Sequence, residues 1–408
     1  MTRLDGVRLA LASLIENPLR SFLTLVGIAM GVTAVIFVVS VINGLNLYVA
    51  EKLSVLGPDV FVVDKYGIIK SHEEWVRARR RNPDLKWEDV AAIRRQTTLV
   101  DKIAVTKDTG TTVKRGKNSV TDVYVRAATA EVFEIEPYEI ADGRAFSSAE
   151  VDRAARVCVL GWDVADTLFP RGDGVGREVT ALGRGFQVIG VGEKRGSSFG
   201  QSEDNYAMIP ITAYEKIRGS WGSLSIAVRA SDPNRVEDAI DEVRSALRAR
   251  HHVKYNDDDD FGIVTADALM TLWRDLTVMI FNVAVFVVSI SLVVGGIVIM
   301  NIMLLTVVER TREIGVRKAV GARYGDIFFQ FLAESVMLCA LGGVLGVGMG
   351  WAGVGLVRVL TPLPAKLPLW APILAVSVTS AVGVFFGLHP ARHAGRLDPI
   401  EALRSETV

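Results

Sequence analysis

Two stretches of the 408-residue sequence contain residue types that could bind a nucleotide or a metal ion. Residues 110–118 (GTTVKRGKN) look like the GxxxxGKS/T loop that binds phosphate groups. However, five residues separate the two glycines instead of four, and Asn118 stands where the motif requires serine or threonine. The sequence therefore predicts no nucleotide site in this stretch.

The second stretch is the pair His251 and His252, followed by the acidic run 257–260. Adjacent histidines on one helix do not face the same way, and an acidic run is usually a solvated loop. We therefore expect a solvated loop rather than a metal site. No nucleophile–base pair is visible in residues 43–270, so we predict no catalytic, metal or cofactor site, and no enzyme.

The composition separates charge from hydrophobicity. Lys+Arg and Asp+Glu are both 46, half of the residues are apolar, and the mean hydropathy is +0.31. These values fit together only if the charged and apolar residues lie in different parts of the chain, which excludes an ordinary soluble enzyme. Zero net charge also argues against nucleic acid as a partner. Cys158 and Cys339 lie in apolar segments, which favours buried thiols over a disulfide.

Four apolar stretches are long enough to span a bilayer, which takes about 20 residues. They cover residues 22–42, 276–308, 327–357 and 370–388. The first is too long for a signal peptide, so we interpret it as a retained anchor. A helix over 276–308 would be about 50 Å long, against about 30 Å of hydrocarbon, so it should project from the membrane. Pro362, Pro364 and Pro368 separate the last two stretches into a hairpin.

The orientation follows from the positive charges in the short loops. Eleven lie in residues 1–21, 309–326 and 389–408, compared with Arg358 and Lys366 in the short loop between the last two spans. Both termini and the 309–326 loop are therefore expected in the cytoplasm, with 43–275 outside. Apolar residues on one side of 4–19 predict a cytoplasmic amphipathic helix in 1–21 that lies on membrane lipid. Residues 389–408 would be a cytoplasmic tail.

The segment 43–275 carries most of the charge and is predicted to be a mixed α/β domain. Expected strands are 60–64, 102–107, 121–128, 156–161, 224–230 and 262–265, with a hairpin at 179–192. One helix should start after Asp232-Pro233 and another near Trp87. Four arginines, at 77, 79, 80 and 81, form a solvated helix face or a lipid-headgroup contact, and we favour the former.

The most informative stretch is 309–331 (ERTREIGVRKAVGARYGDIFFQF), a short amphipathic segment between two spans. Its glycines at 315, 321 and 325 allow tight turns and close approach. A positive loop of this kind anchors the topology. Charges of both signs with spaced glycines also indicate a docking surface for a cytoplasmic partner.

Three blocks, 291–322, 341–350 and 389–406, resemble the FtsX-like permease domain of the type VII ABC transporters. This family includes the MacB exporters and the lipoprotein-release permeases. Residues 156–170, 190–200 and 224–250 are similar to the MacB periplasmic core domain, in which we place a β-rich insert at about 129–212. The resemblance thus implies an α-helical membrane protein with four transmembrane helices and a large mixed α/β extracytoplasmic domain between helices 1 and 2.

The resemblance also implies a dimer of two permease copies or paralogues in the cell (inner) membrane that works by mechanotransmission. ATP and Mg would bind to an ABC ATP-binding subunit, whose closure the long helices carry outward. Because this sequence has no GxxxxGKS/T motif, we expect ATP hydrolysis in a separate protein, as for the stand-alone permeases. A periplasmic adaptor or membrane-fusion protein stays open as a further partner.

The family's docking role falls on the loop after the second span. It is carried onto Glu309, Arg310, Arg312, Glu313, Ile314, Gly315, Val316, Arg317 and Lys318, with Ile314 and Val316 as apolar anchors. Gly342, Gly346 and Gly350 recur every four residues and predict close helix packing. Glu334 is the ionisable group within the third span, and we favour a structural hydrogen bond over proton coupling.

The expected function is export or extraction of an amphipathic compound, peptide or lipoprotein from the outer side of the membrane. The alternative is an FtsX-like regulator, which passes ATP-driven motion to an external partner such as a cell-wall hydrolase without moving a substrate. A large external domain favours the first, and this preference rests on analogy.

Overall fold

The computed structural model describes residues 18–54, 57–136, 138–198, 200–361 and 364–404. The chain divides into two compact units. The helical unit comprises Met1–Tyr48 and Asp275–Val408, and the α/β unit comprises Val49–Arg274. The amphipathic helix predicted in residues 1–21 lies almost entirely outside the described residues.

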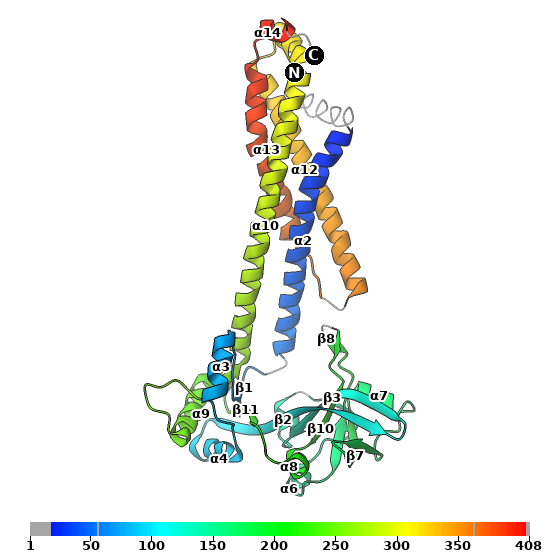
Figure 1. Ribbon diagram of the computed structural model, residues 1–408, viewed down its shortest axis with the longest axis vertical. Coiled ribbons are helices and arrows are strands. Elements are labelled where there is room, and N and C mark those ends of the chain that lie inside the picture. Colours follow the sequence, from blue (N-terminus) through cyan, green and yellow to red (C-terminus); the bar gives the residue numbers. More distant parts are fainter. Residues whose placement is uncertain (1–17, 55–56, 137, 199, 362–363, 405–408) are drawn as a thin grey trace. The chain divides into compact units, whose positions relative to one another are not determined.

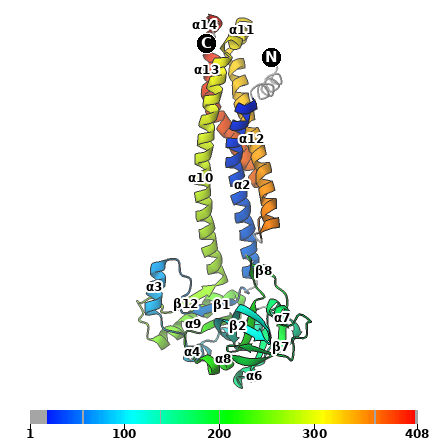
Figure 2. The same cartoon turned by 45° about the vertical axis from the view of Figure 1, so that its right-hand side comes forward.

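Four helices are long and apolar enough to cross a membrane. They are α2 (Pro18–Ser54), α10 (Ala266–Glu309), α12 (Tyr324–Leu360) and α13 (Trp370–Arg396) (Figure 1). In both views α12 lies beside α2 (Figure 2). Four apolar helices with a mixed α/β domain between the first and second confirm the predicted fold class.

All four helices extend beyond their apolar stretches, α12 by only three residues at each end and the other three much further. The helix α2 continues past residue 42 to Ser54, and α10 begins at Ala266 rather than at 276. Thr265 caps α10, since its Oγ1 accepts the Ala268 N–H at 3.0 Å. The helix α13 continues beyond 388, through Pro390, to Arg396. Hydropathy marks where a chain is apolar, whereas caps determine where a helix ends.

The α/β unit is built on one mixed, 10-stranded sheet. Its path runs β12-β1-β11-β2-β3-β10-β5-β7-β4, and β6 pairs with β2 and β7. The strands are β1 (Val60–Asp64), β2 (Val100–Arg115), β3 (Asn118–Ala128), β4 (Ile140–Gly143), β5 (Val157–Leu160), β6 (Glu178–Ala181), β7 (Arg184–Gly192), β10 (Tyr206–Pro210), β11 (Ser225–Ala230) and β12 (Gly262–Thr265). A separate small hairpin joins β8 (Ser197–Ser198) and β9 (Gln201–Ser202).

All the predicted strands are present, and β4, β8, β9 and β10 are additional. The predicted helix starts are confirmed as well. Asp232 accepts the Asn234 N–H before a short 3-10 turn, η1 (Pro233–Arg235), and α9 (Val236–His251) follows. The other helices of the α/β unit are α3 (His72–Arg81), α4 (Trp87–Gln96), α5 (Val132–Ile135), α6 (Ser148–Asp152), α7 (Trp162–Leu168) and α8 (Ile211–Arg218).

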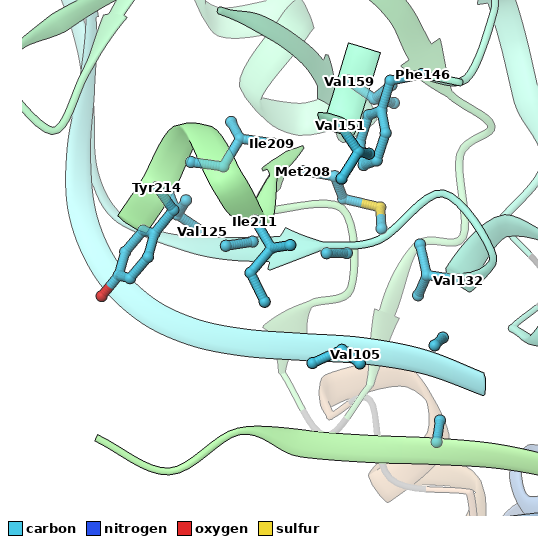
Figure 3. Packing of buried hydrophobic residues seen from close by; sticks show 14 of the residues in the cluster. Val105, Val125, Val132, Phe146, Val151, Val159, Met208, Ile209, Ile211 and Tyr214 are labelled. Atoms are coloured by element: carbon cyan, nitrogen blue, oxygen red, sulfur yellow. The ribbon is translucent and has the colours of Figure 1, made fainter. Parts of the chain in front are cut away.

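A continuous apolar core holds this sheet and its helices together. Figure 3 shows part of it, with Met208 and Ile209 from β10, Val125 from β3 and Val105 from β2. Burying such side chains stabilises the fold by roughly 1.5–3 kcal/mol each. Cys158 in this core and Cys339 in α12 are free, buried thiols, as predicted.

Candidate functional site

The connection between α10 and α12 contains a short helix, α11 (Thr311–Ala319). It starts after the α10 terminus at Glu309 and ends shortly before Gly321, whose φ of +107° is a conformation that glycine adopts readily. The N-terminal part of the predicted amphipathic segment is therefore helical, with an inner and an outer face.

The inner face of α11 packs on a second short helix, α14 (Pro399–Arg404). A Cβ on Gly315 would lie 2.8 Å from the Ala402 Cβ, so only glycine permits this approach. The Lys318 Nζ donates to the backbone oxygens of Gly395 and Leu397, both at 2.6 Å, at the end of α13. Gly315 and Lys318 thus position α11.

This packing corrects one expected docking contact. Ile314 was expected as an apolar anchor for a partner, but it is buried in the helical unit together with Gly315. In helices, residues two apart face different sides, so Val316 is half-exposed while Ile314 is not. Val320, just after the helix, is 84% exposed.

Apart from Lys318, the remaining docking residues line the outer side of this connection. Glu309, Arg312 and Glu313 are exposed, whereas Arg310 and Arg317 are half-buried. The Arg317 Nη1 donates to the Gln330 Oε1 at 3.0 Å, and its Nη2 lies 3.8 Å from the Glu313 carboxylate. The outer face therefore presents charges of both signs around half-exposed Val316, an arrangement that can orient a protein partner.

The three glycines of α12 lie against α2. Added Cβ atoms on Gly342, Gly346 and Gly350 would meet Ile28, Val32 and Ile36, at 3.0, 2.6 and 2.6 Å. The absence of a side chain at each position therefore lets the two helix backbones approach closely. In lipid, where apolar burial supplies little net drive, such close packing is what associates helices.

Glu334 of α12 is buried within the helical unit. The next residue, Ser335, donates from its Oγ to the Gly383 carbonyl oxygen of α13 at 3.0 Å. Glu334 thus faces the interior of the bundle, where an intramembrane ionisable residue is normally found.

A buried charge cluster in the α/β unit was missed by the sequence analysis. The His251 Nδ1 lies 2.8 Å from Asp260, and its Nε2 lies 2.9 Å from Asp89 of α4. Asp89 is only 1% exposed, and its carboxylate also forms an ion pair with the Arg250 Nη1 at 2.8 Å. The expectation of a solvated acidic run is therefore wrong for two of its residues: Asp260 pairs with His251, and Asp259 pairs with Arg248.

The protonation of this cluster follows from its geometry. Hydrogen bonding to Asp89 raises the pKa of His251, against the effect of burial. Burial raises the pKa of Asp89, but hydrogen bonds from His251 and from the Lys86 backbone outweigh it and lower that pKa overall. An imidazole flanked by two carboxylates donates to both only when it is doubly protonated. The described residues contain no group of three His, Cys, Asp or Glu side chains that could hold a metal ion.

Two other sequence candidates have structural roles. Residues 110–118 form the end of β2, a two-residue turn at Gly116-Lys117 and the start of β3, not the strand–loop–helix of a phosphate site. The arginine cluster lies on α3, which the structure describes fully and which has no buried residue. Arg79 stacks 5.1 Å above Trp75, and Arg81 bonds Asp258 at 3.3 Å.

Comparison with known proteins covers both units. Residues 21–246 match the model of the MacB-like periplasmic core domain, and residues 285–399 match that of the FtsX-like permease C-terminal domain. Among solved structures, the periplasmic region of MacB from Actinobacillus actinomycetemcomitans is 20% identical with a TM-score of 0.46. It covers 56% of this chain and 98% of that chain.

Curated relatives match along almost the full sequence. A macrolide export ATP-binding/permease protein MacB from Azoarcus sp. (strain BH72) is 35% identical over 98% of this chain and 60% of that protein. The protein of the same name from Neisseria meningitidis serogroup A is 31% identical over 98% of this chain and 61% of its own length. The chain thus spans about 60% of the length of these relatives. Both domain models and both relatives place the chain in the MacB/FtsX-like family of ABC transporter permeases.

Proposed function

We propose that this chain is the membrane subunit through which an ABC ATP-binding subunit moves an extracytoplasmic domain. The observation that carries this proposal is α11, a helix between two membrane-spanning helices with a charged outer face. Its inner face is fixed to α14 and to the end of α13. A partner that displaces α11 would therefore pull on the helical unit rather than deform a loop.

The path of the motion follows the chain. The helix α10 is continuous over 44 residues and begins directly after β12. The strand β12 pairs with β1, which follows α2 in the sequence. An unbroken helix transmits displacement along its axis. When two ATP-binding subunits that hold ATP and Mg close, α10 would therefore carry their movement to the sheet of the α/β unit. The assembly requires a second permease copy or a paralogue, each copy with one docking face.

Charge supports the proposed orientation, and the family supports the proposed class of cargo. The positive residues of the α10–α12 loop and of the termini support a cytoplasmic position for these segments, and with it an extracytoplasmic position for the α/β unit. A large domain there is suited to collecting an amphipathic compound, peptide or lipoprotein for export or extraction. Macrolide export in the names of two relatives supports this class of cargo.

Purification from native membranes in mild detergent tests the coupling. We expect a stoichiometric ATP-binding subunit with the wild-type chain, and a loss of about tenfold in its binding when Arg312→Ala is combined with Val316→Ser. Arg392→Ala, at an exposed arginine of α13, is the matched control and should bind as the wild type does. A wild-type chain that carries no ATP-binding subunit while its dimer stays intact contradicts the proposal.

A second measurement separates transport from regulation. The complex is reconstituted in vesicles with an amphipathic fluorescent compound in the leaflet opposite α11, and ATP is added on the side of α11. ATP-dependent extraction of the compound supports transport. ATP turnover without extraction from any of a set of amphipathic compounds, peptides and lipoproteins favours the regulatory alternative.

A further inference from the structure

The helix α14 is held in place by its contact with α11. Asp398 caps it, since its Oδ1 accepts the Ile400 N–H at 2.8 Å and its carbonyl accepts the Ala402 N–H at 2.9 Å. The helix has only six residues, and helices this short are not stable alone in water. Among its described side chains, only Ala402 is fully buried, and it is the one that meets Gly315.

The apolar side chains of α14 otherwise face away from the protein. Ile400 is 77% exposed and Leu403 is half-exposed. A single exposed apolar residue needs no explanation, but several on adjoining elements mark an interaction site. Burying each of these side chains against a partner would contribute roughly 1.5–3 kcal/mol.

The exposed surface of α14 continues that of α11. The Leu403 Cγ would lie 3.5 Å from a Cβ on Gly315, and Gly315 directly precedes half-exposed Val316. Because Gly315 lacks a side chain, nothing separates Leu403 from the α11 backbone at this point. Val316 and Leu403 therefore flank the same glycine, one from each helix.

We propose that α14 is the second half of the docking surface for the ABC ATP-binding subunit, with Ile400 and Leu403 as its apolar anchors. This inference rests on the proposed function, which places only α11 at that interface. The occupant is a protein rather than a lipid surface, because Glu401 is exposed between Ile400 and Ala402. A six-residue helix of this kind has no continuous apolar face to lie in a bilayer interface.

A partner that binds both helices would also account for the close packing of α11 on α14. A partner that grips both helices would move them as one piece, together with the end of α13 through the Lys318 hydrogen bonds. Force from the ATP-binding subunit would thus enter α10, α12 and α13 together. A grip on α11 alone would leave the contact of Gly315 with Ala402 and Leu403 to carry the load between the two helices.

The test titrates the ATP-binding subunit that co-purifies with the wild-type chain against full-length variants in detergent. Ile400→Ser combined with Leu403→Ser should weaken binding at least about tenfold, as expected for anchors at the centre of an interface. Leu369→Ser is the matched control, because Leu369 is also an exposed apolar residue but lies in the α12–α13 connection. Binding within about twofold of the wild type by the double variant overturns the proposal.

A crosslinking measurement does not depend on whether the double variant keeps α14 folded. A photoreactive amino acid at position 400 should form an adduct with the ATP-binding subunit, and the same amino acid at 369 should not. An adduct at 400 with phospholipid alone overturns the proposal. Different results would contradict the two proposals. If α11 variants lose binding but position 400 forms no adduct, only the role of α14 is removed. A wild-type chain that binds no ATP-binding subunit removes the proposed function itself.

Discussion

The α/β unit and the helical unit achieve close packing with opposite kinds of residue. In the α/β unit, large side chains such as Phe61, Phe169 and Phe186 fill a continuous interior. In the helical unit, α12 meets α2 through Gly342, Gly346 and Gly350. The first arrangement removes apolar surface from water, and the second removes the side chains that would keep two backbones apart.

The difference follows from the solvent around each unit. In water, burial of apolar surface is the main favourable term in folding, so large side chains belong inside. In lipid, an exposed leucine loses little, and helices associate through close contact instead. Large apolar side chains on α10 are exposed accordingly, Val278 and Phe286 among them. The same residue type should therefore have a different energetic weight in the two units.

The largest expected effect comes from deleting one leucine side chain in each unit. Leu168→Ala, in the core at the end of α7, should lower the free energy of unfolding of the α/β unit by about 2–5 kcal/mol. Leu345→Ala, half-exposed on α12, should cost less than about 1 kcal/mol in lipid. Native-state hydrogen exchange of β5 and of α12 measures the two. Equal costs would show that both units depend on apolar burial to the same degree.

The next effect concerns charge, because the α/β unit buries His251 between the carboxylates of Asp89 and Asp260. Because the pKa of His251 is raised in the folded protein, its protonation stabilises the contact between α4 and α9. This stabilisation is complete below the ordinary histidine pKa of about 6.5 and is lost as the pH rises through the raised pKa. Asp89 has the opposite pH dependence. The stabilisation from its ionised carboxylate is complete above the ordinary aspartate pKa of about 3.9 and is lost as the pH falls through the lowered pKa.

The substitution His251→Gln should remove the histidine part of this pH dependence and cost about 1.5–3 kcal/mol, as for hydrogen bonds to charged groups. Hydrogen exchange in α4 and α9 at several pH values, corrected for intrinsic exchange, gives both quantities. His72→Gln is the matched control, because His72 is exposed on α3. A pH dependence that survives in His251→Gln and vanishes in His72→Gln would contradict the assignment.

The fold could be predicted from the sequence where one physical signal dominates. The four apolar stretches reflect a single requirement, the hydrocarbon thickness, and strands such as 60–64 carry a strong β-branched signal. The ends of α2 and α10 could not be predicted from hydropathy, because caps such as Thr265 and helix-forming residues beyond the apolar run determine them. The strand β10 (YAMIP) was missed because a short, fully buried strand shows no alternation.

The candidate site shows where sequence reasoning stops. The loop 309–326 stands out by charge and glycine spacing, so its importance could be predicted. Which residues face outward could not, because that depends on α14, whose contact with α11 joins residues far apart in the sequence. The pairing of His251 with Asp89 has the same origin, at a separation of 162 residues. Only the acidic run next to His251 gave a local signal, and it indicated a solvated loop.

The smallest expected effect tests the glycine packing directly. Gly346→Val should destabilise the helical unit by about 1–3 kcal/mol, because its Cβ would lie 2.6 Å from the Val32 Cβ and 2.7 Å from the Ala29 oxygen. Gly348→Val is a matched control on the same helix, since no atom lies within 4 Å of its Cβ position. Thermal unfolding of both variants in the same lipid nanodiscs compares them. If Gly348→Val is as damaging as Gly346→Val, then loss of helix flexibility, rather than contact with α2, explains the glycine requirement.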